Sequence, residues 1–292
     1  MTNSEQKLCA LRKLNFQKIL KFNHEIDVES YDYLRYKENN YQHQKISGYC
    51  IACEELGCSH SSEDNNYKLT NISHGTHSSD IFQSLFEKID ISNWYQDPIM
   101  FVFESPSLDY GIFQDLEFNG VKKRPSKLWY WIHQDQSIVT YPDKFRGMEY
   151  GAFVLSAILT FKIANAYITN LIKCGMNNSE GKYKGLNSYK QETIEKCYDQ
   201  ILSEEIEIHN PKVIFAFGSN VERQLIRLTG NKRLIQQLPH PAGQQRGFRN
   251  EHYKAIFFWN IIAAMHKVGI ISTEDGCEFA RIFLEKYDNS AV

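Results

Sequence analysis

The stretch KVIFAFGSNVERQLIRLTGNKRLIQQLP (residues 212–239) decides the fold class of this chain of 292 residues. It reads as an apolar strand that ends at Gly218, a short helix with Ser219 as its N-cap, and a second strand. Strands that alternate with helices form a parallel sheet with helices on both of its faces. We therefore predict an α/β fold of three layers, in which helices flank a central, mostly parallel sheet of four strands.

The same alternation continues on both sides of this stretch. Two further strands are predicted in IMFVFES (residues 99–105) and AYITNLI (residues 166–172), because both are short apolar runs followed by polar turns. The stretch of residues 58–80 is almost devoid of large apolar side chains and is expected to be a loop. Helices are expected over residues 80–89, 151–165, 191–208, 253–269 and 274–287.

The N-terminal part of the chain differs from the rest. Leu8, Leu11 and Leu14 recur at a rough helical spacing, after which the sequence becomes polar and rich in tyrosine. We predict a helical N-terminal extension over residues 1–45. Residues 46–292 are expected to form one α/β domain, a length that can bury a full core.

Composition and charge disfavour several classes of protein. The 33 Lys and Arg residues against 35 Asp and Glu residues give a formal net charge of −2, which argues against DNA binding by the surface as a whole. Two local basic clusters remain, each either a solvated face or a phosphate contact. The first comprises Lys122, Lys123, Arg124 and Lys127, and the second Arg246 and Arg249. No apolar window reaches about 18 residues and the N-terminus lacks a secretory pattern. We expect a cytoplasmic protein with reduced cysteines, no membrane contact and no obligate protein partner.

Polar side chains follow three of the predicted strands. Glu104 lies at the end of the first, Asn170 lies near the end of the second with Cys174 just after it, and His240 follows the last. The carboxyl ends of parallel strands meet at one edge of the sheet, where α/β proteins bind their ligands. An acid, an amide and an imidazole at this edge form a candidate active site.

The seven cysteines include one pair with metal-ligand spacing. Cys50 and Cys53 are separated by two residues, a gap that lets two thiolates bind one metal centre. With Cys174 and Cys197 they would suit zinc or an iron–sulfur cluster. Two alternatives are inert buried thiols and a local zinc site, whose ligands would be Cys50, Cys53, Cys58 and His60.

Five short motifs occur in an order that resembles a known family. They are CIAC (residues 50–53), FESPS (103–107), YITNLIKC (167–174), PKVIFAFG (211–218) and HPA (240–242). Together they resemble the uracil-DNA glycosylase superfamily, and most closely its iron–sulfur branch, family four. The likeness covers about residues 48–268, with every motif in register.

The resemblance implies an activity, which is hydrolysis of the N-glycosidic bond of a flipped-out uracil or modified pyrimidine in single- or double-stranded DNA. Glu104 would stabilise the sugar cation and orient a water, and His240 would stabilise the departing base anion. Asn170 would read the edge of the base. The resemblance also implies a [4Fe–4S] cluster held by Cys50, Cys53, Cys174 and Cys197.

The loop after His240 is implied to enter the minor groove. Phe248 is the candidate wedge that holds the base out of the stack, with Arg246 and Arg249 on phosphates. A plain surface loop is the alternative interpretation.

Departures from the family pattern bear on the substrate. Ser105 and Ser107 replace two glycines around Pro106, and residues 108–127 lack the phenylalanine that stacks on uracil. We predict that this segment, with Phe113 and Phe118 among its aromatic residues and the basic cluster at Lys122, Lys123 and Arg124, walls an enlarged base pocket. A bulky modified cytosine of phage DNA, removed by a defence enzyme, is therefore an alternative to uracil.

Two other classes of protein agree less well with the sequence. A non-catalytic DNA-binding relative is disfavoured because Glu104, Asn170 and His240 are all present. An unrelated nucleotide-binding enzyme is disfavoured because neither a G-x-G-x-x-G nor a Walker lysine motif occurs in the chain.

Overall fold

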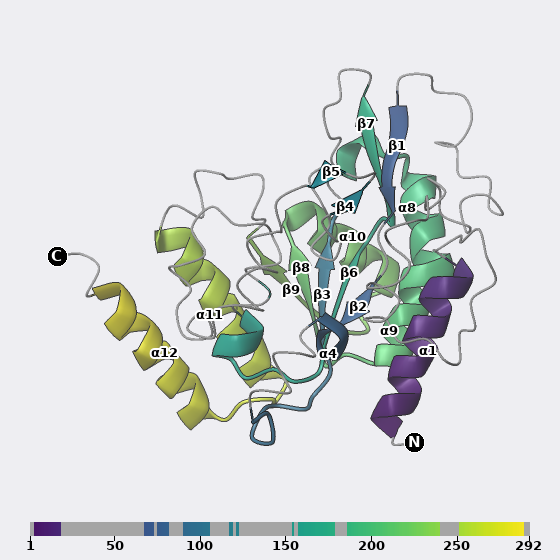
Figure 1. Cartoon of the computed structure of the whole chain (residues 1–292). Helices are drawn as coiled ribbons and strands as arrows, with labels where there is room; N and C mark the ends of the chain where they lie inside the picture. The colour runs from purple at the N-terminus through teal and green to yellow at the C-terminus, as the bar shows by residue number, and fades with distance from the viewer. Residues whose placement is uncertain are drawn as a thin grey trace. The chain divides into compact units, whose positions relative to one another are not determined.

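A computed structural model describes residues 3–18, 67–72, 75–81, 90–105, 117–118, 121–122, 154, 157–178, 186–239 and 251–288. Its main sheet has the strand order β2-β6-β3-β8-β9 (Figure 1). These strands are β2 (Thr76–His77), β6 (Ala166–Asn170), β3 (Ile99–Phe103), β8 (Val213–Phe217) and β9 (Leu234–Leu238). Four of them are parallel and helices flank the sheet, as predicted, whereas the short edge strand β2 pairs antiparallel with β6.

Apolar side chains fill the centre of the sheet. Every residue of β3 and β8 is buried, which explains why both strands read as continuous apolar runs in the sequence. The Phe101 and Phe215 rings stack with centroids 5.3 Å apart. The parallel register of β8 and β9 runs from Val213 opposite Leu234 to Phe217 opposite Leu238.

The chain divides into two compact units. The first comprises Met1–Gln83, Val102–Lys127 and Tyr167–Asn210. The second comprises Ser84–Phe101, Leu128–Ala166 and Pro211–Val292. The predicted domain boundary near residue 45 lies outside the described residues and stays a prediction.

In the first unit, helix α1 (Asn3–Lys18) packs against α9 (Ser203–His209). Leu11 and Leu14 of α1 are buried, in agreement with the helical spacing of its leucines. The helix expected over residues 191–208 is present as α8 (Gln191–Cys197), a π-helical turn η4 (Tyr198–Leu202) and α9. Its last helical residue is His209, after which Asn210 adopts a φ of 53° as the C-cap and Pro211 follows. A 3-10 turn, η3 (Leu186–Ser188), precedes it.

The expectation of a loop over residues 58–80 is wrong for its last part. Strand β1 (Tyr67–Ile72) pairs antiparallel with β7 (Cys174–Asn178), and β2 and helix α4 (Ser78–Ile81) follow it. Main-chain pairing with β7 makes β1 a strand, although its sequence YKLTNI is not a continuous apolar run. A short hairpin joins β4 (Glu117–Phe118) to β5 (Val121–Lys122).

In the second unit, α10 (Ser219–Thr229) connects β8 to β9, and α11 (Glu251–Lys267) and α12 (Thr273–Asp288) end the chain as predicted. The N-cap of α10 is Gly218 and not Ser219, and no side chain caps this helix end. Gly218 has a φ of 94°, a conformation that glycine adopts without steric strain, and its N–H donates to the Leu238 carbonyl oxygen over 2.8 Å. The turn from β8 into α10 therefore depends on glycine geometry and not on a serine cap.

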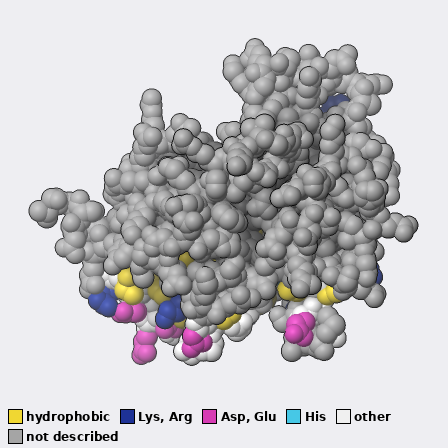
Figure 2. All heavy atoms as spheres, in the orientation of Figure 1, with side chains coloured by type: hydrophobic (Ala, Val, Ile, Leu, Met, Phe, Trp, Pro, Cys, Tyr) yellow, Lys and Arg dark blue, Asp and Glu magenta, His cyan; other side chains and the backbone are white. Residues whose placement is uncertain are grey.

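Charged side chains of both signs lie beside one another over the lower left of Figure 2, where Figure 1 places α12. Glu278 and Arg281 of this helix form an exposed ion pair at 2.7 Å. Such mixed charge is typical of a solvated helix face. Among the described residues, no helix is both long and apolar enough to span a bilayer.

Candidate active site

Glu104 lies directly after strand β3, at its carboxyl end. Burial raises the pKa of its carboxyl from 4.5 to about 7, because a partly dehydrated site disfavours the charged form. Within the described residues, no cation or hydrogen-bond donor to this carboxylate opposes that effect. Glu104 is thus an acid whose proton is exchanged near neutral pH, a property common at functional sites.

Asn170 is the last residue of β6, the strand beside β3. Two main-chain hydrogen bonds join the ends of these strands. The Leu171 N–H donates to the Phe103 carbonyl oxygen over 2.8 Å, and the Ile172 N–H donates to the Glu104 carbonyl oxygen over 3.0 Å. Glu104 and Asn170 therefore lie at the ends of neighbouring strands. The sequence predicts that they share the carboxyl edge of the sheet, but it does not predict that their strands are adjacent.

A carboxyl and an amide at adjacent strand ends are a useful chemical pair. The amide offers both a donor and an acceptor, which can recognise the polar edge of a planar base. An ionised carboxylate can stabilise positive charge that develops on a neighbouring group. Ser105 follows Glu104 and is 8% exposed, whereas Pro106 and Ser107 lie outside the described residues.

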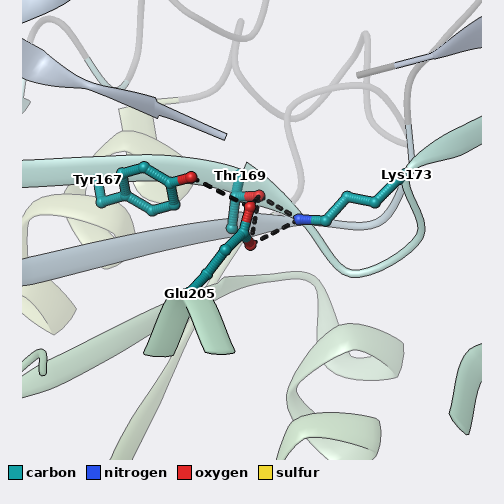
Figure 3. Close-up of polar contacts among 4 residues, drawn as sticks. All are labelled: Tyr167, Thr169, Lys173 and Glu205. Carbon is teal, nitrogen blue, oxygen red and sulfur yellow. Dashed lines mark hydrogen bonds and ion pairs between the residues drawn. The ribbon is translucent and has the colours of Figure 1, made fainter. Parts of the chain in front are cut away.

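A buried polar network lies next to this edge (Figure 3). The Glu205 carboxylate of α9 accepts hydrogen bonds from the Tyr167 hydroxyl over 3.1 Å and from the Thr169 hydroxyl over 3.0 Å. The Lys173 ammonium forms an ion pair with the same carboxylate at 2.7 Å and donates a further hydrogen bond to the Thr169 hydroxyl. The Lys173 and Glu205 side chains are both 0% exposed.

Sequence reasoning missed this network. Tyr167 and Thr169 are two residues apart on β6 and so share one face, and Lys173 interrupts an otherwise apolar segment. Nothing in the sequence marks Glu205 as their partner, because it stands among the other acidic residues of a helix about thirty positions later. Three residues of the YITNLIKC motif thus donate hydrogen bonds to one buried carboxylate.

The candidate metal ligands are described only in part. Cys197 ends α8 and is buried, and Cys174 begins β7 opposite Ile72. Both belong to the first unit. The ion pair between Lys173 and Glu205 links the turn before Cys174 to the helical segment that follows Cys197. Cys50 and Cys53, like Cys58 and His60, lie outside the described residues. Within the described ranges, no cluster of three or more His, Cys, Asp or Glu residues could hold a metal ion.

Most of the predicted DNA-contacting residues also lie outside the described ranges. These are Phe113, Lys123, Arg124, Arg246, Phe248 and Arg249, together with His240, which comes two residues after β9. The backbones of Phe118 and Lys122 belong to the β4–β5 hairpin, in which Phe118 pairs with Val121 and Lys122 with Glu117. Their roles at a DNA interface stay predictions.

These features define an α/β protein with an ionisable carboxyl and an amide at the carboxyl edge of a parallel sheet. The chain belongs to the uracil DNA glycosylase superfamily, since the model of that family matches residues 90–263, more than half of its length. The matched range includes Glu104, Asn170 and His240, begins after Cys50 and Cys53, and does not distinguish the branches of the superfamily. A comparison with curated proteins found no match.

Proposed function

We propose that this protein is a DNA glycosylase that removes uracil or a modified pyrimidine from DNA and leaves an abasic site. Membership of the superfamily supports the reaction class. The observation that carries the proposal is the placement of Glu104, with its pKa raised to about 7, at the strand end beside that of Asn170. This pair supplies a carboxylate for the sugar and an amide for the base.

The reaction builds positive charge on the sugar and negative charge on the departing base, after the nucleotide has rotated out of the stack. The Glu104 carboxylate stabilises the cation and orients the attacking water. A partly dehydrated carboxylate interacts more strongly with such a cation than a fully solvated one does. Because only the ionised form can do this, activity rises with pH as Glu104 loses its proton near pH 7.

Asn170 and His240 act on the base. The Asn170 amide donates to and accepts from the edge of the pyrimidine, which selects the base. His240 donates a hydrogen bond to the base oxygen and stabilises the negative charge of the leaving group. Phe248, Arg246 and Arg249 hold the flipped conformation and contact phosphates.

We further propose membership of the iron–sulfur branch, with a [4Fe–4S] cluster held by Cys50, Cys53, Cys174 and Cys197. Four thiolates suit such a cluster, and Cys197 is a buried thiol in the same unit as Cys174. The cluster would act as a structural crosslink between chain segments. Anaerobically purified protein should contain iron and absorb at about 400 nm. Colourless protein that contains zinc would support a zinc site instead. Protein without bound metal would contradict both.

The substrate is decided by a panel of oligonucleotides. Duplexes and single strands that carry uracil, hydroxymethylcytosine or glucosylated hydroxymethylcytosine are incubated with the protein, and alkali then cleaves any abasic site. The reshaped segment 108–127 favours a bulky base, and hence a role in defence against phage. Faster release of uracil would indicate repair, and release of no base would refute the proposed activity.

A further inference from the structure

We propose that Glu205 is a positioning residue, which acts through Thr169 and Lys173 to hold the end of β6, and with it Asn170 and Glu104, in the geometry needed for base release. The effect on base release rests on the proposed function, whereas the effect on the strand end does not. Glu205 lies on α9, outside the two strand ends that carry the candidate site.

The contacts of Glu205 surround the strand end. Thr169 precedes Asn170, and Lys173 lies in the turn that connects β6 to β7. Thr169 donates to both carboxylate oxygens of Glu205, at 3.3 and 3.0 Å, and Lys173 reaches the same carboxylate at 2.7 Å. Asn170 is therefore flanked on both sides along the chain by residues bound to one buried group.

The same turn is bonded to the strand that carries Glu104. Leu171 and Ile172, between Asn170 and Lys173, donate their N–H groups to the carbonyl oxygens of Phe103 and Glu104. If Lys173 lost its ion pair with Glu205, the turn could shift, and those two hydrogen bonds would weaken. Glu205 is thus linked to both candidate active-site residues by a continuous chain of hydrogen bonds and backbone.

Burial excludes a direct role for Lys173 in binding DNA, since its side chain is 0% exposed. Stability alone is a weak explanation for the ion pair, because buried ion pairs can often be replaced by apolar residues without loss of stability. A fully satisfied polar network can, however, fix the arrangement of the chain segments that it joins, because hydrogen bonds are directional. The network is therefore suited to setting the position of the strand end.

The test uses the whole chain of 292 residues and three variants of it. Glu205→Gln keeps the shape of the side chain but removes its charge. Lys173→Met/Glu205→Leu replaces both charges by apolar groups, so that no unpaired charge stays buried if the single variant fails to fold. Glu278→Gln, which breaks the exposed ion pair with Arg281 on α12, is the matched control.

Hydrogen exchange of the peptide that contains Leu171 and Ile172 reports on the strand end without any substrate. We expect exchange about tenfold faster in the folded double variant and unchanged exchange in the control. Single-turnover base release from a uracil-containing or glucosylated duplex, whichever the wild-type protein cleaves faster, is measured in parallel. A misplacement of this kind should lower the rate constant about 10- to 100-fold and change the apparent Kd for DNA less than about threefold.

A folded double variant with wild-type exchange, or with faster exchange but a wild-type rate constant, would overturn the inference. A double variant that folds, exchanges faster at the strand end and releases the base more slowly than the wild-type protein supports it. If the wild-type protein releases no base, the proposed function fails, and hydrogen exchange still decides whether Glu205 holds the strand end.

Discussion

Removal of the charge of Glu104 is expected to stabilise the fold at alkaline pH while abolishing base release. Burial raises the pKa of this carboxyl from 4.5 to about 7. One pKa unit corresponds to 1.36 kcal/mol, so keeping Glu104 ionised in the folded state opposes folding by at most about 3 kcal/mol. Because the carboxyl is partly exposed, solvent screening lowers this figure, and we expect about 2 kcal/mol.

The sign follows from the two pKa values of Glu104. The unfolded chain loses the proton near pH 4.5, whereas the folded protein keeps it until about pH 7. Between these values the folded state binds more protons, so the free energy of unfolding falls as the pH rises. The Glu104→Gln variant carries no titrating group at this position and does not show this loss.

Urea unfolding followed by circular dichroism checks the prediction at about pH 4.5 and about pH 8. The variant should gain about 2 kcal/mol relative to the wild-type protein between the two conditions. Glu278→Gln is the control, because hydrogen bonding to Arg281 lowers the pKa of the exposed Glu278 and removing that group should not stabilise the protein at high pH. If the free energies of unfolding of Glu104→Gln and the wild-type protein differ by the same amount at both pH values, the reasoning is refuted.

Three further changes test separate parts of the structure. Asn170→Asp loses the amide donor at the end of β6, so release of the preferred base should fall by about 100-fold or more in single-turnover assays, with a smaller loss of DNA affinity. Gly75→Ala should lower the free energy of unfolding by about 2 kcal/mol in urea titrations, because a Cβ at Gly75 would lie 2.0 Å from the Tyr167 hydroxyl oxygen; wild-type stability would contradict this packing. Cys53→Ala should remove the bound iron and the absorption at about 400 nm and lower the melting temperature, and retention of iron would exclude Cys53 as a ligand.

The parallel core was predictable because its signal lies within short segments. β3 and β8 are apolar over their whole length, and Gly218 marks the turn into α10. The strand ends followed from the same reasoning, since parallel strands bring their carboxyl ends to one edge. The sequence therefore predicts that Glu104 and Asn170 lie at the same edge of the sheet, and the strand order of the structure makes them neighbours there.

What escaped prediction depends on contacts between distant segments. β1 is a strand because β7 pairs with it, about one hundred residues away, and neither segment alternates polar and apolar residues clearly. Glu205 is a buried partner of Lys173 only because α9 packs where it does, and a helix with several acidic residues does not reveal which one is buried. A local sequence pattern predicts whether a residue lies in a helix or a strand. Which strand it pairs with, and whether its charge is buried, depends on residues far away in the sequence.

The central claim is that Glu104 acts, as a carboxylate, in hydrolysis of a glycosidic bond in DNA. The most direct test is the single-turnover rate of base release as a function of pH, for the wild-type protein and Glu104→Gln, on the oligonucleotide that the wild type cleaves fastest. The wild-type rate should rise with an apparent pKa of about 7, and the variant should be slower by at least about 100-fold while binding the same DNA with little change in Kd. A Glu104→Gln variant that releases the base at the wild-type rate, with the same dependence on pH, would contradict the account.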